Sequence, residues 1–243
     1  MKVPPYHWWR TVFFLIPAVS VYTIVLGTAS LLSTLFNRGG DAGHRCARSW
    51  AWLIVKTTGV RVRVAGLEHV DPSRSYVVAA NHQSIYDIPI LFTVLPLQLR
   101  IVAKDSLGRI PFLGWHLQRT GHLLIDRKHP GAGILKRMAA LVRAARSLIV
   151  FPEGTRSADG RVGRFKGGIF LLAIDSSLPV LPISVARSRF VMAKGRLMVC
   201  PEEVAVTVHA PMATTGISRE QAREFAEQVR EVVRRGVDEP QLT

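Results

Sequence analysis

The feature that most constrains the fold is an uncharged stretch near the amino terminus. No Asp, Glu, Lys or Arg occurs from Thr11 to Asn37, and residues 12–36 are dominated by Val, Leu, Ile, Phe and Ala. At about 1.5 Å of rise per residue, a helix of this length crosses a hydrocarbon core of about 30 Å. Trp8 and Trp9 precede it, and such rings favour the headgroup zone. We therefore expect residues 1–58 to form a membrane-associating helical segment.

Two other interpretations of this stretch stay open, a cleaved signal peptide and a buried core helix. The apolar run continues past residues 27–30 to Phe36, which argues against a signal peptide, and Pro17 predicts a kink in the helix. Residues 47–60 mix Trp and aliphatic side chains with Arg48 and Lys56, a composition typical of a helix that lies along a membrane surface. The sequence does not distinguish a spanning segment from one lying on the bilayer.

The charge balance indicates an anionic partner. The chain of 243 residues has 32 Lys and Arg against 17 Asp and Glu, a net charge of +15. Such an excess suits nucleic acid, anionic lipid or phosphorylated substrates. Nucleic acid is not expected, because the basic residues are not interleaved with aromatic ones and the uncharged stretch has no use in that role. Cys46 and Cys200 form neither a disulfide framework nor a zinc motif, so we expect a reducing compartment and no metal.

After residue 58, short apolar runs alternate with helical patterns, and this alternation predicts an α/β fold with a mixed, largely parallel sheet flanked by helices. Residues 59–243 are expected to form one catalytic domain. The expected strands cover residues 61–64, 75–80, 100–103, 123–125, 148–151, 180–185, 196–200 and 203–209. The expected helices cover residues 88–95, 107–119, 131–146, 168–176 and 218–235, and the last opens with a capping-box pattern, Ser218 to Gln221.

The segment Asn81–Asp87 follows one of these strands and carries a candidate general base. On a continuous helix His82 and Asp87 would stand about 140° apart and could not meet, but at a strand-to-helix turn they can. Asp87 would then fix the tautomer of the imidazole, so that its other nitrogen can take a proton from a hydroxyl. The plainer alternatives are a helix N-cap for Asp87 and an ordinary loop histidine for His82.

A second polar segment, Phe151–Ser157, also follows a strand, so its side chains should emerge at the carboxyl end of the sheet. Gly154 permits a tight turn, and the planar guanidinium of Arg156 matches a phosphate. The alternative is a surface ion pair of Arg156 with Glu153, worth less than about 1 kcal/mol. Further along, Lys166 and the start of a helix could form an anion pocket, or simply a solvated basic loop.

Together, Asn81–Asp87 and Phe151–Ser157 resemble the lysophosphatidic acid (1-acylglycerol-3-phosphate) acyltransferase family of the glycerolipid acyltransferases. Two further blocks are similar to that family. One contains Lys104, Leu107, Pro111, Gly114, Gly121 and Ile125-Asp126-Arg127, and the other is Leu178-Pro179-Val180-Leu181-Pro182-Ile183. The four blocks stand in the family's order and cover about residues 75–186, whereas nothing after Ala186 is diagnostic.

The resemblance implies transfer of a fatty acyl group to the sn-2 hydroxyl of lysophosphatidic acid, giving phosphatidic acid. It implies that His82 is the base, oriented by Asp87, and that the thioester donor is acyl-CoA or acyl-carrier protein, a co-substrate rather than a cofactor. Arg127 and Arg156 would hold the acceptor's phosphate, and Lys104 would stabilise the oxyanion or touch phosphate. The other expected substrate-binding residues are Glu153, Gly154 and Thr155.

Alternatives remain within and outside this resemblance. The acceptor could be glycerol-3-phosphate or lyso-ornithine lipid, although the latter offers less phosphate for Arg156 and Arg127. A non-enzymatic basic protein of the membrane surface would be indifferent to loss of His82. A hydrolase is disfavoured, because Ser84 does not lie in the Gly-x-Ser-x-Gly pattern of a nucleophile elbow. The expected location is the cell inner membrane or the cytoplasmic face of a membrane.

Overall fold

A computed structural model describes residues 5–36, 40–125, 140 and 146–240 of the chain. The helices are α1 (Pro5–Arg10), α2 (Ile16–Ser33), α3 (Asp41–Thr58), α4 (Asp87–Val94), α5 (Leu113–Arg119), α7 (Gly168–Asp175), α8 (Ser188–Val191) and α9 (Ala222–Asp238). The strands are β1 (Arg61–Ala65), β2 (Val77–Ala80), β3 (Leu99–Lys104), β4 (Leu123–Ile125), β5 (Ser147–Val150), β6 (Val180–Ala186) and β7 (Glu203–Val208). A π-helical turn, Thr11–Leu15, joins α1 to α2, and 3-10 turns cover Leu67–His69 and Asp105–Arg109.

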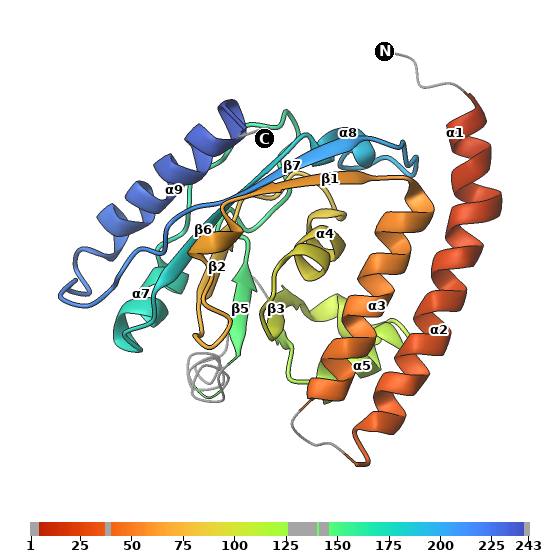
Figure 1. The fold of residues 1–243 in the computed structure, drawn as a ribbon, viewed down its shortest axis with the longest axis horizontal. Helices are drawn as coiled ribbons and strands as arrows, with labels where there is room; N and C mark the ends of the chain where they lie inside the picture. Colours follow the sequence, from red (N-terminus) through yellow and green to blue (C-terminus); the bar gives the residue numbers. More distant parts are fainter. Residues whose placement is uncertain (1–4, 37–39, 126–139, 141–145, 241–243) are drawn as a thin grey trace.

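Among the described residues, seven strands form one sheet in the order β1-β7-β6-β2-β5-β3-β4 (Figure 1). β2 pairs parallel with both of its neighbours, β5 and β6. β3 continues the parallel run to β4, whereas β6 and β7 pair antiparallel and β1 pairs parallel with β7. The carboxyl ends of β2, β3, β4, β5 and β6 therefore lie at one edge of the sheet. The mixed, largely parallel α/β fold is confirmed.

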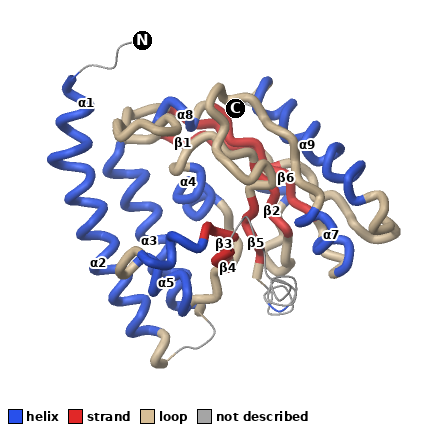
Figure 2. The backbone as a smooth tube through the Cα atoms, turned by 180° about the vertical axis from the view of Figure 1, so that it is seen from behind, coloured by secondary structure: helices blue, strands red, loops and turns tan. Residues whose placement is uncertain are grey.

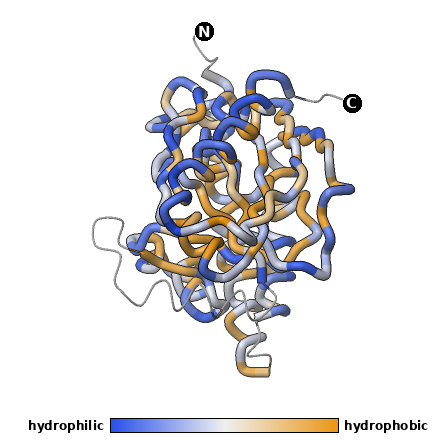
Figure 3. The backbone as a smooth tube through the Cα atoms, turned by 90° about the vertical axis from the view of Figure 1, so that its left-hand side faces the viewer, coloured by the Kyte–Doolittle hydropathy of each residue, from blue (hydrophilic) through white to orange (hydrophobic). Residues whose placement is uncertain are grey.

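Helices cover both faces of the sheet, with α7 and α9 on one face and α3 and α4 on the other (Figures 1 and 2). Alternate residues of β2 serve the two layers: Val77 packs in the cluster that contains Phe170 of α7, and Val78 in the one that contains Ile90 of α4. This is the period of two expected of a strand buried on both faces. Figure 3 looks onto the α9 side, where many residues along the backbone trace are coloured hydrophilic.

The amino-terminal segment packs α2 along the outside of α3 (Figure 1). The helical stretch Tyr6–Ser33 is long and apolar enough to cross a membrane, and only 11% of its most apolar window is buried. Leu15 and Ile54 nevertheless belong to the same apolar core as the sheet. The expected boundary between residues 58 and 59 thus separates elements that share one core, and the division stays a prediction.

Some expected elements differ in the structure. The helix expected over residues 107–119 is broken, because Pro111 cannot continue it and Phe112 has a φ of +60°, with Leu113 N–H donating to the Pro111 carbonyl at 2.7 Å. No strand forms over residues 196–200, within the described part of the chain. In this segment the backbone N–H of Val199 donates to Thr11 Oγ1 at 3.0 Å and not to a carbonyl of a neighbouring strand. The helix expected over 131–146 lies mostly outside the described residues.

The last helix, α9, begins four residues later than residue 218, where the sequence pattern placed its start. Half of the expected capping box is present, because the backbone N–H of Ser218 donates to Gln221 Oε1 at 2.8 Å. The segment expected over residues 47–60 is most of α3, which begins at Asp41 and ends at Thr58, just before Gly59, whose φ is +78°. A glycine in this conformation commonly ends a helix.

Candidate active site

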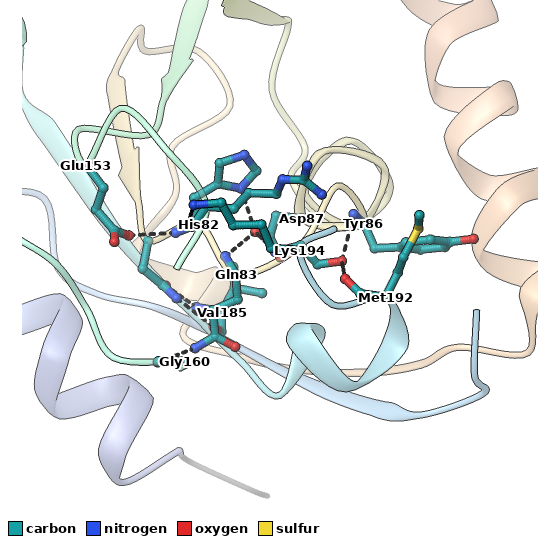
Figure 4. A network of polar contacts seen from close by, with 12 residues as sticks. His82, Gln83, Tyr86, Asp87, Glu153, Gly160, Val185, Met192 and Lys194 are labelled. Atoms are coloured by element: carbon teal, nitrogen blue, oxygen red, sulfur yellow. Dashed lines mark hydrogen bonds and ion pairs between the residues drawn. The ribbon is translucent and has the colours of Figure 1, made fainter. Parts of the chain in front are cut away.

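His82 and Asp87 meet at the turn between β2 and α4, as expected for a strand-to-helix junction (Figure 4). His82 Nδ1 lies 2.8 Å from Asp87 Oδ2. Because an ionised carboxylate only accepts hydrogen bonds, Nδ1 carries the proton and donates it, which leaves Nε2 with a free lone pair. The pair therefore has the polarity of a general base with an orienting acid.

Asp87 also shapes the turn that contains the histidine. Its side chain is fully buried, and Oδ2 accepts the backbone N–H groups of Gln83 (2.8 Å) and Ser84 (2.9 Å) as well as His82 Nδ1. Asp87 is the first residue of α4, so its carboxylate stabilises the preceding turn rather than capping the helix from the position before it. The N-cap interpretation is thus replaced by a turn built around the carboxylate.

The loop after β5 lies directly against this turn. The ring of Phe151 stacks on that of His82 with centroids 4.0 Å apart and an interplanar angle of 18°. Ser157 N–H donates to the His82 carbonyl at 2.7 Å, and Gln83 Nε2 donates to the Gly160 carbonyl at 2.9 Å. These contacts bring the two sequence motifs, about seventy residues apart, into one site (Figure 4).

Glu153 joins three segments through its two carboxylate oxygens. Oε1 accepts the backbone N–H of His82 at 2.8 Å, and Oε2 accepts that of Gly163 at 3.0 Å. Burial raises the pKa of Glu153, although these two hydrogen bonds counteract it. Glu153 therefore holds the loops that carry the base and the candidate phosphate ligands, and its expected contact with substrate stays a prediction.

Lys194 is a cation of this site that the sequence did not suggest. Its ammonium, in the loop after α8, donates to the Arg156 carbonyl (2.9 Å) and to Thr155 Oγ1 (3.2 Å) (Figure 4). The side chain of Lys166 lies against Gly154, whose φ is +75° and whose missing Cβ would stand 2.9 Å from Lys166 Nζ. Two ammonium groups thus flank the turn before Arg156. No sequence motif contains Lys194, so the sequence alone did not identify it as a site residue.

Three further residues were predicted for the site: Lys104, Lys166 and Arg127. Lys104 ends β3 at the same edge of the sheet, and its side chain is exposed. Lys166 precedes α7, but its backbone N–H already donates to the Pro152 carbonyl at 3.0 Å, so the expected pocket of unpaired N–H groups loses this member. Arg127 lies outside the described residues.

A cavity of about 140 Å³ adjoins the histidine turn. Ile85, between His82 and Asp87, and Ile88 and Pro89 of α4 form one side of it. Its other lining residues come from α2, α3, β3 and the region of α5, and almost all are apolar: Thr23, Leu26, Gly27, Cys46, Ala47, Trp50, Phe92, Ile101, Leu107, Phe112, Leu113, His116, Leu117 and His122. A largely apolar cavity beside a base suits a hydrocarbon chain.

Comparison with known proteins shows that the sequence of this chain is similar to those of acyltransferases. A sequence model of the family described as Acyltransferase matches residues 61–186. The chain is 31% identical over 208 residues to the 1-acyl-sn-glycerol-3-phosphate acyltransferase of Saccharomyces cerevisiae, covering 84% of this chain and 68% of the yeast protein. It is 33% identical to the alpha enzyme of that name from Mus musculus, covering 71% of this chain and 62% of the mouse protein.

A solved structure is similar over nearly the whole chain. The crystal structure of the 1-acyl-sn-glycerophosphate (LPA) acyltransferase PlsC from Thermotoga maritima has a TM-score of 0.84 and 26% sequence identity, covering 98% of both chains. By contrast, the chain spans about three fifths of the length of some relatives, 60% of a chloroplastic enzyme from Brassica napus for example. The amino-terminal helices of the present chain are included in the structural match.

Proposed function

Because this chain belongs to the acyltransferase family, whose sequence model covers residues 61–186, we propose that it transfers a fatty acyl group from a thioester donor to the sn-2 hydroxyl of lysophosphatidic acid. The product is phosphatidic acid. The observation that carries the proposal is the 2.8 Å contact of His82 with Asp87, next to the loop that presents Arg156. The names of the yeast and mouse relatives support lysophosphatidic acid as the acceptor.

The proposed reaction needs no acyl-enzyme. Nε2 of His82 takes the proton of the acceptor hydroxyl while its oxygen forms a bond to the thioester carbonyl carbon. The tetrahedral intermediate collapses with cleavage of the carbon–sulfur bond, and the leaving thiolate takes the proton back from His82. Lys104, at the same sheet edge, is proposed to stabilise the oxyanion or to touch phosphate. The donor is acyl-CoA or acyl-carrier protein.

The acceptor's phosphate is proposed to bind at the turn after β5. Arg156 provides a planar fork, and Lys166 and Lys194 add positive charge to either side of that turn. Arg127 of the second motif block is proposed as a further ligand on the resemblance alone.

We expect replacement of Arg156 by alanine to raise the KM for lysophosphatidic acid by about tenfold or more, because a charge-assisted contact to phosphate is lost. The assay compares lysophosphatidic acid, glycerol-3-phosphate and lyso-ornithine lipid side by side. Arg156→Lys should recover part of the loss, since the charge is kept without the fork. Arg161→Ala is the matched control, because this exposed arginine of the same loop pairs only with Asp159, 3.8 Å away, among the described residues. Equal KM values for wild type and Arg156→Ala would contradict the assignment, and no transfer to any acceptor would contradict the proposed function.

The proposed site of action is a membrane surface, with the inner membrane or a cytoplasmic face as the expected location. The outer side of the amino-terminal helices exposes large apolar side chains to solvent, including Trp9, Phe13, Phe14, Leu35 and Phe36. Many large apolar side chains exposed on one segment are typical of a membrane or partner contact. The excess of basic residues favours anionic lipid, each well-placed cation adding about 1 kcal/mol.

The double substitution Phe13→Asp and Phe14→Asp is expected to weaken binding to anionic vesicles at least tenfold, because burial of one such side chain contributes about 1.5–3 kcal/mol. Both side chains are more than half exposed, so the fold should persist. Vesicle flotation measures the effect. Leu67→Asp is the control, since Leu67 is an exposed apolar residue at the far end of β1 from α3. Undiminished binding of the double variant would contradict a membrane role for this face.

A further inference from the structure

Two histidines, His116 and His122, line the apolar cavity, and neither is used by the proposed chemistry. Both are buried, and their ring centroids lie 5.3 Å apart. Burial, together with the positive charge of Arg100, lowers the pKa of His116 to about 4, and burial lowers the pKa of His122 well below its ordinary value. Both rings are therefore neutral at physiological pH, and each has one donor and one acceptor nitrogen.

The hydrogen bonds of His116 are internal. Its Nδ1 lies 2.6 Å from Ser30 Oγ, and its Nε2 lies 3.5 Å from Thr120 Oγ1. The Thr120 hydroxyl already donates to the His116 carbonyl, so it can only accept from the ring. His116 thus carries its proton on Nε2 and accepts the Ser30 hydroxyl at Nδ1. This ring links α2 to α5 and is not available to a ligand.

His122 differs in this respect. Its Nδ1 accepts the backbone N–H of Ile101 at 3.1 Å. The neutral ring must therefore carry its proton on Nε2, and among the described residues no hydrogen bond joins this atom to an acceptor. A polar donor without a partner in a largely apolar cavity is unfavourable. Bridging water needs two to four polar partners, and this almost wholly apolar wall offers few.

The position of His122 fixes where along a bound chain the donor would act. The cavity runs from Ile85, in the turn before α4 and beside the catalytic pair, to Phe92 of α4, whose ring stacks on that of His122 with centroids 6.2 Å apart. The rise of five residues along α4 from Asp87 to Phe92 corresponds to about 7.5 Å. The donor therefore lies well inside the cavity, away from the point at which an acyl carbonyl would meet His82.

We propose that this cavity binds a fatty acyl chain with a mid-chain oxygen substituent, such as a hydroxyl group, whose oxygen accepts the Nε2 hydrogen of His122. The proposal rests on the proposed acyl transfer, because the chain is the one attached to the donor or to the lysolipid. In this proposal His122 determines which acyl chain is preferred and takes no part in the chemical step.

The test is a competition between stearoyl and hydroxystearoyl chains in detergent-free vesicles. One arm places the hydroxyl on the thioester donor with an unsubstituted lysolipid, and the other places it on the lysolipid, which identifies the chain that occupies the cavity. In the arm whose hydroxylated chain occupies the cavity, we expect kcat/KM to be three- to tenfold higher for a chain with a mid-chain hydroxyl than for the plain chain. This is the gain from one hydrogen bond. A 3-hydroxyl should give no preference, because it stays near the carbonyl.

His122→Asn removes the Nε2 donor while its side-chain oxygen can still accept from Ile101 N–H, so the preference should fall to about one. Cys46→Ala alters the same cavity wall without touching the donor and should keep the ratio of the two rates. A preference that survives His122→Asn would overturn the proposal. If that variant does not fold, equal rates for all hydroxyl positions in the wild type would overturn it as well. Transfer of plain stearoyl chains in these assays shows the proposed function separately, so the two can fail independently.

Discussion

Acyl transfer to lysophosphatidic acid is expected to fall by about 10²- to 10⁴-fold when His82 is replaced by alanine, the range typical of losing a general base. No other imidazole approaches this position, since the remaining described histidines of the site region are the buried rings of the cavity. Initial rates of product formation in vesicles measure the loss. Membrane binding and thermal unfolding should change little.

The matched control for this substitution is His69→Ala. His69 lies after β1, where its Nδ1 is 3.0 Å from the Val208 carbonyl, outside the proposed site. Activity within about tenfold of the wild type for His82→Ala would show that His82 is not the base. In that case the contact with Asp87 would have to be regarded as part of the turn's structure alone.

Replacement of Asp87 by asparagine is expected to lower kcat by about 10²- to 10⁴-fold with little change in KM. Oδ2 accepts three N–H groups, whereas buried Oδ1 has no partner among the described residues. An asparagine that keeps its oxygen at the three donors must bury an unsatisfied NH2 group, and the opposite orientation points that group at N–H donors. Either way the imidazolium that forms in the reaction loses its countercharge.

Separate measurement of kcat and KM checks this expectation, because Asp87 is fully buried and cannot contact substrate. Asp71→Asn is the control, as Asp71 is an exposed carboxylate that accepts Ser73 N–H at 2.9 Å in the loop before β2. A loss confined to KM would contradict the role of Asp87 in orienting the base. A fully active Asp87→Asn variant would contradict it as well.

The position of the candidate site was predictable because its residues stand directly after strand ends. Apolar runs before Asn81 and Phe151 mark β2 and β5, and because these strands are parallel neighbours, their carboxyl-terminal turns lie at one edge of the sheet. The contact of Lys194 with Arg156 was not predictable, since it depends on the path of a loop after α8 that no periodicity describes. The wrong strand at 196–200 has the same origin: alternating Leu197 and Val199 resemble a strand, yet one side chain, Thr11, takes the backbone N–H of Val199.

The cavity was hidden for a different reason. Residues 12–36 are apolar on all sides, so the sequence predicts a membrane segment but no face that turns toward the protein. In the structure, Thr23, Leu26 and Gly27 of this segment complete the cavity wall. His122 likewise stands in a block that resembles the family, but its hydrogen bonds become known only when β3 is placed beside β4.

Because α2 forms part of the cavity wall, its surroundings bear on how selectivity for the acyl chain should be measured. Gly27 of α2 packs so closely on the turn at Phe112 that an added Cβ would stand 3.0 Å from Phe112 Cβ, so small displacements of α2 change the width of the cavity. On the side of α2 away from the cavity, Val25 is exposed to its surroundings. With α2 at a membrane surface, as proposed, lateral pressure and acyl order in the surrounding lipid act on this wall of the cavity. Preferences measured in micelles should differ from those in fluid or rigid bilayers, which makes the lipid phase itself an experimental variable.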